Sequence, residues 1–246
     1  MSEHRFDTPN PVRLELKLAA GDVRVVSVDG GESVVTLEGP ARAVQEMHVE
    51  LIGERLIVSE ARKGLMGIFA GIGEPLRARL EVPHGSHVDA TTAAADVHLD
   101  GTFAGASMTS ASGDLEAVGE ITGDVDVKTA NGDVQMPRVA GNLRVKSVSG
   151  DVKVGAVDGS VSVKSVSGDL QVASVRAGKV DIHSVSGNAL IGIAAGSCVD
   201  VDAGSASGEL SSEIPLTGAQ PEHTDAPVVV IRVSTVSGDM RLRRAA

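Results

Sequence analysis

The chain of 246 residues carries a formal net charge of −11 at pH 7, contains no Trp and no Tyr, and is rich in glycine, with 29 Gly. The negative charge argues against a general nucleic-acid binder, and the missing aromatic side chains remove the usual stacking surfaces for bases. Cys198 stands alone, which excludes an intrachain disulfide, and we expect it to be a small buried hydrophobic residue.

A nine-residue unit begins at Leu14, after a polar lead-in over residues 1–13. The unit reads apolar-x-apolar-x-x-apolar-x-Gly-polar, and residues 14–39 hold two clear copies and a weaker third, which predict the first coil strands. The alternation over its first three residues predicts a strand, and the three-residue step to the third apolar residue predicts a corner. Glycine followed by a polar residue predicts a second, tighter corner, so each unit forms one side of a coil.

Residues 40–87 interrupt this pattern and predict an insertion. The residues after Pro40 predict a short helix with proline in its first turn. The segment 49–59 predicts a hairpin that turns at Gly53, and the alternation over residues 76–83 predicts a further strand.

An apolar, glycine-rich loop without a charged residue spans residues 64–73 of this insertion. It either folds over the mouth of the coil as a cap or is exposed as a contact for a membrane surface or a partner protein. The candidate contact residues are Leu65, Met66, Ile68, Phe69 and Ile72.

The pattern resumes over residues 88–210 and is clearest from 143 to 169, where three units follow one another. Corner signatures such as Ser149-Gly-Asp151 and Ser167-Gly-Asp169 recur about every 18 residues, with slightly wider spacing where a turn is longer. Two units per turn, with like corners stacked on like, predict an all-β fold: a single-chain β-solenoid, or β-helix, with about 18 residues per turn. The whole chain is expected to form one domain.

The coil is predicted to close over residues 228–246, after a loop excursion over residues 211–227 that carries three prolines. Arg241, Arg243 and Arg244 follow the last unit. We expect them at the open end of the coil, where charges discourage a strand edge from pairing with another chain.

Three columns of side chains follow from stacking like positions. The first is basic and forms either a solvated row or an anion-binding row. In the second, each Asp is expected to cap its own turn, with a ladder of calcium sites as the alternative. The hydroxyl groups of the third are expected to pair with one another as sheet neighbours. The basic column contains Lys128, Lys146, Lys164 and His183; the acidic column contains Asp114, Asp133, Asp151, Asp169 and Asp239; the hydroxyl column contains Ser110, Thr129, Ser147, Ser165 and Ser184.

No arrangement of residues in the sequence points to catalysis. The seven His include no metal-ligand spacing beyond a weak His84-x-x-His87, and neither a Gly-x-Ser-x-Gly elbow nor a phosphate-binding Gly-x-x-x-x-Gly-Lys-Ser/Thr loop occurs. Parallel β-coils also host polysaccharide-active enzymes, but the aromatic platforms that bind sugars are missing. We therefore expect no enzyme, cofactor, metal or small-molecule substrate.

The iterated motif resembles a bacterial putative-adhesin family of β-strand repeats, a domain of unknown function. The resemblance is carried by Leu18-Ala-Ala-Gly-Asp-Val-Arg-Val25, by Leu80-Glu-Val-Pro83, and by Ser-Val-Ser-Gly-Asp-Val/Leu-x-Val at 147–154 and 165–172. It implies a β-solenoid without established catalytic residues. Some relatives occur in proteins of the Gram-positive envelope-stress response, which implies an envelope link by analogy.

Taken together, the pattern favours a non-enzymatic scaffold or protein-interaction module that binds a protein partner or its own copies through the ends or faces of the coil. The alternative is a peripheral adhesin-type or envelope-stress protein that contacts a membrane or cationic peptides through the 64–73 loop and the acidic surface. A polysaccharide-active β-helix enzyme is the second alternative. Neither a secretion signal nor a membrane-spanning run is seen, so we expect a cytoplasmic location.

Overall fold

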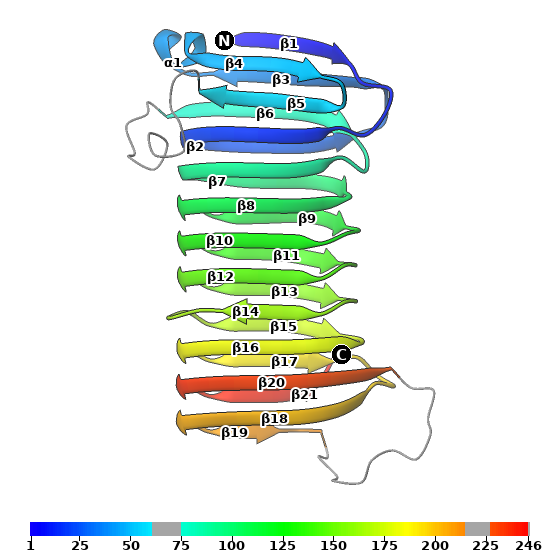
Figure 1. Ribbon diagram of the computed structural model, residues 1–246, viewed down its shortest axis with the longest axis vertical. Coiled ribbons are helices and arrows are strands. Elements are labelled where there is room, and N and C mark those ends of the chain that lie inside the picture. The colour runs from blue at the N-terminus through cyan, green and yellow to red at the C-terminus, as the bar shows by residue number, and fades with distance from the viewer. Residues whose placement is uncertain (61–74, 215–226, 246) are drawn as a thin grey trace.

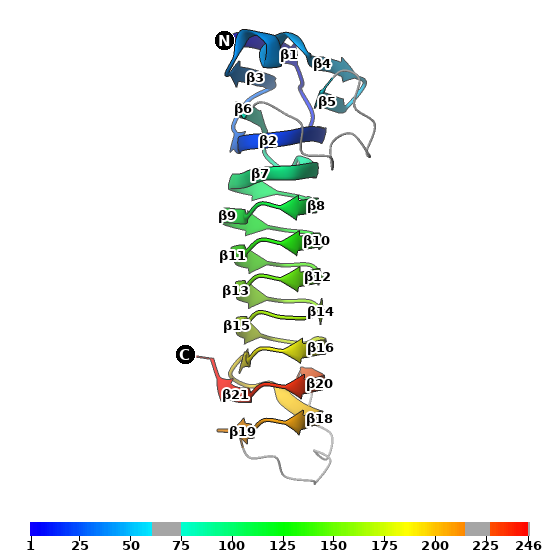
Figure 2. The same cartoon turned by 90° about the vertical axis from the view of Figure 1, so that its left-hand side faces the viewer.

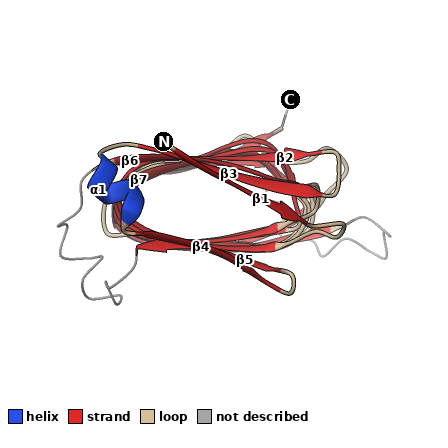
Figure 3. Cartoon of the chain, turned by 90° about the horizontal axis from the view of Figure 1, so that it is seen from above, coloured by secondary structure: helices blue, strands red, loops and turns tan. Residues whose placement is uncertain are grey.

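The computed structural model describes residues 1–60, 75–214 and 227–245, which form one elongated coil (Figure 1). These residues hold 21 strands and one short helix, α1 (Ala41–Gln45). Successive turns stack along the long axis, and the cross-section is flattened so that two sheets face each other (Figures 2 and 3). The predicted all-β solenoid is confirmed.

Most turns contribute one strand to each of the two sheets. We call them the first sheet and the second sheet. The first sheet contains β5 (Arg55–Glu60), β8 (Gly105–Ser112), β10 (Val125–Asn131), β12 (Leu143–Ser149), β14 (Val161–Lys164), β16 (Gly178–Ser186), β18 (Cys198–Ser207) and β20 (Val228–Ser237). The second sheet contains β6 (Leu76–Pro83), β9 (Leu115–Ile121), β11 (Val134–Val139), β13 (Val152–Val157), β15 (Leu170–Val175), β17 (Ala189–Ile193), β19 (Leu210–Ser212) and β21 (Met240–Arg244). Two long strands, β2 (Arg13–Val28) and β7 (His87–Phe103), turn the corner and belong to both sheets.

The turns stack in parallel and in register. Val125 of β10 lies opposite Leu143 of β12, which lies opposite Val161 of β14. The next step, from Val161 to Val180 of β16, is one residue longer. At the corner, Asp151 contacts the residue 18 positions further along the chain, Asp169, in the next turn. The predicted period of about 18 residues per turn is confirmed.

A thin apolar core fills the space between the two sheets. In β12, Leu143 and Val145 point inward and are 1% and 0% exposed, whereas Arg144 and Lys146 point outward. Small β-branched side chains suit this core because they pack well on a pleated surface and interlock with the turns above and below.

The tight corner between the sheets requires glycine. Gly150 has a φ of +125°, which L-residues with a side chain rarely adopt, and a Cβ there would lie 2.2 Å from the carbonyl oxygen of Gly132 in the preceding turn. Both the backbone conformation and the close stacking of turns therefore select glycine, and the predicted Gly-polar corner is confirmed.

The third apolar residue of the unit does not mark a corner. In the first sheet, β12 continues through Ser149, which leaves Val148 on the outer face and 53% exposed. In the second sheet, β13 also continues: Gly155 and Ala156 are two partly exposed residues in succession, and Val157 returns to the core. The prediction of a corner at this step is wrong, because the first strand keeps its alternation and the second bulges.

Antiparallel strands cover the N-terminal end of the coil (Figures 1 and 2). β3 (Glu32–Glu38) pairs with β6, β1 (Ser2–Asp7) pairs with β3, and β4 (Met47–Ile52) pairs with β5. Residues 1–13 are therefore not a loose lead-in, and the third copy of the unit is not a coil strand. The predicted helix and hairpin are present as α1 and as β4 with β5. The segment 40–87 nevertheless adds to the coil, since β5 and β6 stack in parallel on β2.

At each end of the coil, one strand or pair of strands lies between turns that adjoin each other in sequence. β2 lies between the turn formed by β5 and β6 and the turn formed by β7. At the other end, β20 pairs with both β16 and β18, and β21 pairs with both β17 and β19. The expectation of an open edge is wrong for Arg241, which lies between Leu190 of β17 and Ser211 of β19. Arg243 and Arg244 pair with β17 and, among the described residues, with no strand on their other side.

Candidate functional site

The predicted basic column lies on the outer face of the first sheet. Its members occupy one position in four successive strands: Lys128, Lys146, Lys164 and His183. Neighbouring strands are about 4.8 Å apart, so the charges are close. Lys128 contacts Asp126 (Nζ to Oδ1, 3.4 Å), and His183 contacts Asp181 (Nε2 to Oδ1, 2.9 Å). Neither Lys146 nor Lys164 forms an ion pair with any described residue, which leaves the centre of the row free to meet an anionic group.

Asp181 balances the positive charge at the His183 end of the row. Lys179 Nζ donates a hydrogen bond to Asp181 Oδ2 over 2.5 Å. This hydrogen bond, with the charges of Lys179 and His183, lowers the pKa of Asp181 from its ordinary value of 3.8. Asp181 is therefore ionised at neutral pH, and Lys146 and Lys164 are the members of the row without a carboxylate partner among the described residues.

A column of exposed valines runs beside the basic row. It contains Val148, Val166, Val185 and Val236, which are 53%, 48%, 47% and 54% exposed. Each valine comes two residues after a member of the basic row or of its continuation at Ser234, and it follows the same outward alternation, as from Lys146 to Val148. Large hydrophobic side chains exposed in consecutive turns form a continuous apolar stripe of a kind that marks interaction surfaces.

We name these two columns together the lysine-valine face. It consists of Lys128, Lys146, Lys164, His183, Val148, Val166, Val185 and Val236. The period of the repeat predicted its basic half. The valine half was missed because the third apolar residue of each unit was assigned to a corner; carrying the period-two alternation through Ser149 places Val148 outside.

The acidic column forms a hydrogen-bonded ladder along the corner. The Oδ1 atom of each of the five Asp residues in the column accepts a hydrogen bond from the backbone N–H of the corresponding residue in the next turn, over 2.7 to 2.9 Å. The expectation that each Asp caps its own turn is therefore wrong. In spatial order the ladder contains Asp96, Asp114, Asp133, Asp151, Asp169, Asn188, Asp239 and Glu209.

Three serines of the hydroxyl column donate hydrogen bonds to the protein's own backbone, whereas the buried Thr129 Oγ1 has no hydrogen-bond partner among the described residues. Ser147 Oγ donates to the carbonyl oxygen of Ser149 over 3.0 Å, and Ser165 and Ser184 make the same bond to the carbonyls of Ser167 and Ser186. The expected pairing between neighbours is present at Thr92, whose Oγ1 donates to Ser110 Oγ over 3.0 Å. For the three serines, the expectation of pairing is wrong.

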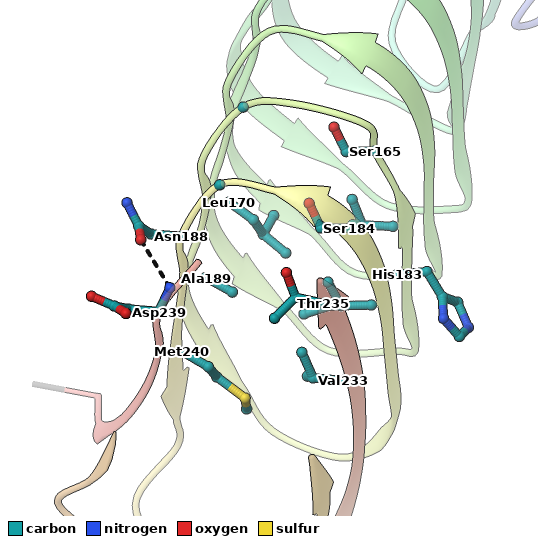
Figure 4. A pocket seen from close by; sticks show the side chains of 14 residues that line it. Ser165, Leu170, His183, Ser184, Asn188, Ala189, Val233, Thr235, Asp239 and Met240 are labelled. Atoms are coloured by element: carbon teal, nitrogen blue, oxygen red, sulfur yellow. Dashed lines mark hydrogen bonds between the residues drawn. The ribbon is translucent and has the colours of Figure 1, made fainter. Parts of the chain in front are cut away.

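A small cavity lies inside the coil between the turns of β14, β16 and β20 (Figure 4). Its volume is about 20 Å³, enough for about one water molecule. Ser184 and Thr235 point into it, whereas His183 points away from it to the outer face (Figure 4). A space of this size leaves no room for an organic substrate.

The remaining candidates from the sequence do not converge on a site. His84 contacts Ser27 and Asp29, whereas His87 contacts Asp89. Across residues 1–60, 75–214 and 227–245, no group of three or more His, Cys, Asp or Glu side chains is arranged to hold a metal ion. No helix within those ranges is both long and apolar enough to cross a membrane. The loop contacts Leu65, Met66, Ile68, Phe69 and Ile72 lie outside the described residues.

Comparison with known proteins places the repeat in a named family. The family model for Toastrack DUF4097 matches residues 13–243. A crystal structure of a putative adhesin from Bacteroides fragilis is 14% identical with a TM-score of 0.55, over 98% of this chain and 96% of that one. A crystal structure of a putative lipid binding protein from Parabacteroides distasonis is 12% identical with a TM-score of 0.56, over the same shares of the two chains, 98% and 96%. The comparison with curated proteins gave no match.

Proposed function

The chain belongs to the Toastrack DUF4097 family, and we propose that it is a non-enzymatic binding module that holds a protein partner against the lysine-valine face. The observation that carries this proposal is the exposed valine column beside two lysines without an ion pair among the described residues. The names of the two structural neighbours, a putative adhesin and a putative lipid binding protein, also favour binding over catalysis.

The face has the composition of a protein interface. Fully burying a valine side chain stabilises a complex by roughly 1.5 kcal/mol, so covering these four half-exposed valines contributes about 3 kcal/mol. The lysines orient the partner and raise the association rate, but they contribute little to affinity, because exposed charges are solvated and screened. A rigid stack of strands also presents the face without a cost in ordering a loop.

The carboxylates on this face favour a protein over an anionic membrane. Asp126 and Asp181 lie two residues before Lys128 and His183 on the same outer surface. A uniformly anionic lipid surface would bring like charge against both aspartates. A protein can place acidic groups opposite Lys146 and Lys164 alone and leave the aspartates facing solvent.

Lysine-specific crosslinking in a lysate of the source cells tests this proposal. The partner should crosslink to Lys146 and Lys164 and be lost from Val148→Asn/Val166→Asn, which keeps both reactive amines. It should also be lost from pull-downs with Lys146→Glu/Lys164→Glu. Lys153→Glu and Val118→Asn change exposed residues of the second sheet and are the matched controls, because Lys153 has no ion pair among the described residues and Val118 is 59% exposed. Partners that crosslink at Lys153, or that survive both face variants, would contradict the proposal.

A further inference from the structure

The C-terminal end of the coil has a free strand edge. β18 is paired with β20 and, among the described residues, with no strand on its other side. The N-terminal end differs, because β3 and β4 cover β6 and β5 there. An uncovered strand of ten residues is a template for pairing with another extended chain.

The hydrogen-bonding groups on the free side of β18 belong to alternate residues. The Cys198 N–H donates to the carbonyl oxygen of Pro227, which leads into β20, over 2.9 Å. In a parallel pair, alternate residues direct both their N–H and their C=O toward the same neighbour. Val199, Val201 and Ala203 therefore present both groups on the free side, at a spacing that an incoming strand can match.

The core is also uncovered at this end. Val199, Val201 and Ala203 are only partly buried, whereas the residues opposite them in β20 are nearly inaccessible: Val229 (0% exposed), Ile231 (0%) and Val233 (5%). The same edge is acidic on its outer side, where Asp200 and Asp202 are exposed. An incoming strand would therefore meet apolar residues on one face and carboxylates on the other.

We propose that the free edge of β18 binds an extended peptide strand in which apolar and basic residues alternate. The apolar residues would cover Val199, Val201 and Ala203, and the basic residues would face Asp200 and Asp202. β20 already pairs with the other edge of β18 through the same alternation of apolar and basic residues. Its Ile231, Arg232 and Val233 lie opposite Val201, Asp202 and Ala203. Arg232 stands directly across from Asp202 there.

A second copy of the chain fits this edge less well. Antiparallel pairing of two β18 strands centred on Val201 sets Asp200 against Asp202 of the other copy, and pairing centred on Asp202 sets that residue against itself. Like charges directly opposite each other destabilise strand pairs. Pairing centred on Ala203 avoids this repulsion but brings Val201 opposite a serine, Ser205, and so gains little apolar burial.

Synthetic peptides test the proposal directly. We would measure the fluorescence anisotropy of a labelled peptide of alternating valine and arginine, and of its glutamate counterpart, with the full chain. The arginine peptide should bind at least about tenfold more tightly, a difference that Asp200→Asn/Asp202→Asn should reduce. Methylating the peptide's backbone nitrogens at alternate residues should abolish binding for one set of residues and spare it for the other, because only one set faces β18.

Two outcomes would overturn this inference. Equal binding of both N-methylated peptides would indicate attraction to the negatively charged protein as a whole, and absence of binding at about 1 mM peptide would exclude the site. A dimer detected by light scattering that the peptide does not dissociate would assign the edge to a second copy instead. Neither result concerns the lysine-valine face, because that face lies on the outer side of the sheet, so the two proposals fail independently.

Discussion

The Oδ1 atom of Asp151 accepts a hydrogen bond from the backbone N–H of Asp169, 2.9 Å away and 18 residues further along the chain. The same contact links each turn to the next, so one side chain per turn satisfies a corner N–H that the tight bend would otherwise leave to solvent. The cost is a row of carboxylates about 5 Å apart, which repel one another. Asn188 shows that an amide can take the same place, because its Oδ1 accepts from the N–H of Asp239 over 3.0 Å (Figure 4).

This ladder predicts opposite effects of two substitutions at Asp151. Asp151→Ala removes the acceptor and should lower the free energy of unfolding by about 1 kcal/mol. Asp151→Asn keeps the acceptor and removes one repelling charge, so it should be neutral or slightly stabilising at low salt. Urea unfolding of both variants at low and high ionic strength measures the difference. An asparagine variant as unstable as the alanine variant would show that the charge, rather than the acceptor, is what matters.

Two valines three residues apart should respond differently to the same change. Val163 is 1% exposed between stacked turns, whereas Val166 is 48% exposed on the lysine-valine face. Val163→Asp buries an unpaired charge and should destabilise the fold by more than about 4 kcal/mol. Val166→Asp should change stability by less than about 0.5 kcal/mol. Thermal unfolding decides, and similar melting temperatures for the two variants would contradict the assigned orientations.

The repeat period predicted the part of the structure that depends on local geometry. Strand alternation and the Gly-Asp corner depend only on contacts within a unit and with its stacked neighbour. The row from Lys128 to Lys164 could therefore be predicted from the spacing of the repeats. The valine column depended on one further local choice, whether β12 turns or continues after Ser147. The ladder from Asp151 to Asp169 could not be separated from a self-capping turn, because both use the same residue types.

The order of turns at the two ends could not be predicted from the repeat. The units are nearly equivalent, so any one of them can stack on any other. The sequence pattern therefore does not predict which units lie next to each other. β2 and β20 each lie between two turns that follow one another in the sequence but do not pair directly. Placing such a segment inside the stack pairs both of its edges. This stabilisation comes from long-range pairing, so it cannot be recognised in the segment's own residues.

The centre of the basic row should tolerate loss of one charge. Lys164→Ala removes repulsion with Lys146 and no ion pair with any described residue, so the free energy of unfolding should change by less than about 0.5 kcal/mol. Lys164→Glu places an opposite charge across from Lys146 and should raise the melting temperature at low salt, an effect that about 0.5 M salt screens out. A drop of several degrees in the alanine variant would mean that the lysine stem packs on the sheet.

The ion pair between Lys179 and Asp181 should make a small contribution that depends on pH. The folded state lowers the pKa of Asp181 below 3.8, so the stabilisation is present above that pH and is lost as the pH falls through the folded-state value. Both side chains are partly exposed, at 45% and 27%, which keeps the effect below about 1 kcal/mol. Lys179→Ala should therefore be less stable than the wild type at neutral pH, and the difference should shrink as the pH falls below 3.8. Lys153→Ala, which removes a lysine without a carboxylate partner among the described residues, is the control and should show no such convergence.

Two glycines with similar backbone conformations allow the cost of backbone strain to be measured separately from the cost of a steric clash between stacked turns. Gly150 and Gly30 have φ values of +125° and +134°, but a Cβ at Gly150 would lie 2.2 Å from the Gly132 carbonyl oxygen, whereas a Cβ at Gly30 meets nothing within 4 Å. Gly30→Ala should cost about 1 to 2 kcal/mol, the usual penalty for a residue with a side chain in this region. Gly150→Ala should cost several kcal/mol more, because the turns of β10 and β12 must move apart and lose the contacts between Val127, Val145 and their neighbours. Urea unfolding of the two variants measures the loss in free energy of unfolding for each. Equal losses would mean that the coil can open by a few tenths of an ångström at little cost, and that backbone conformation alone selects glycine at each corner.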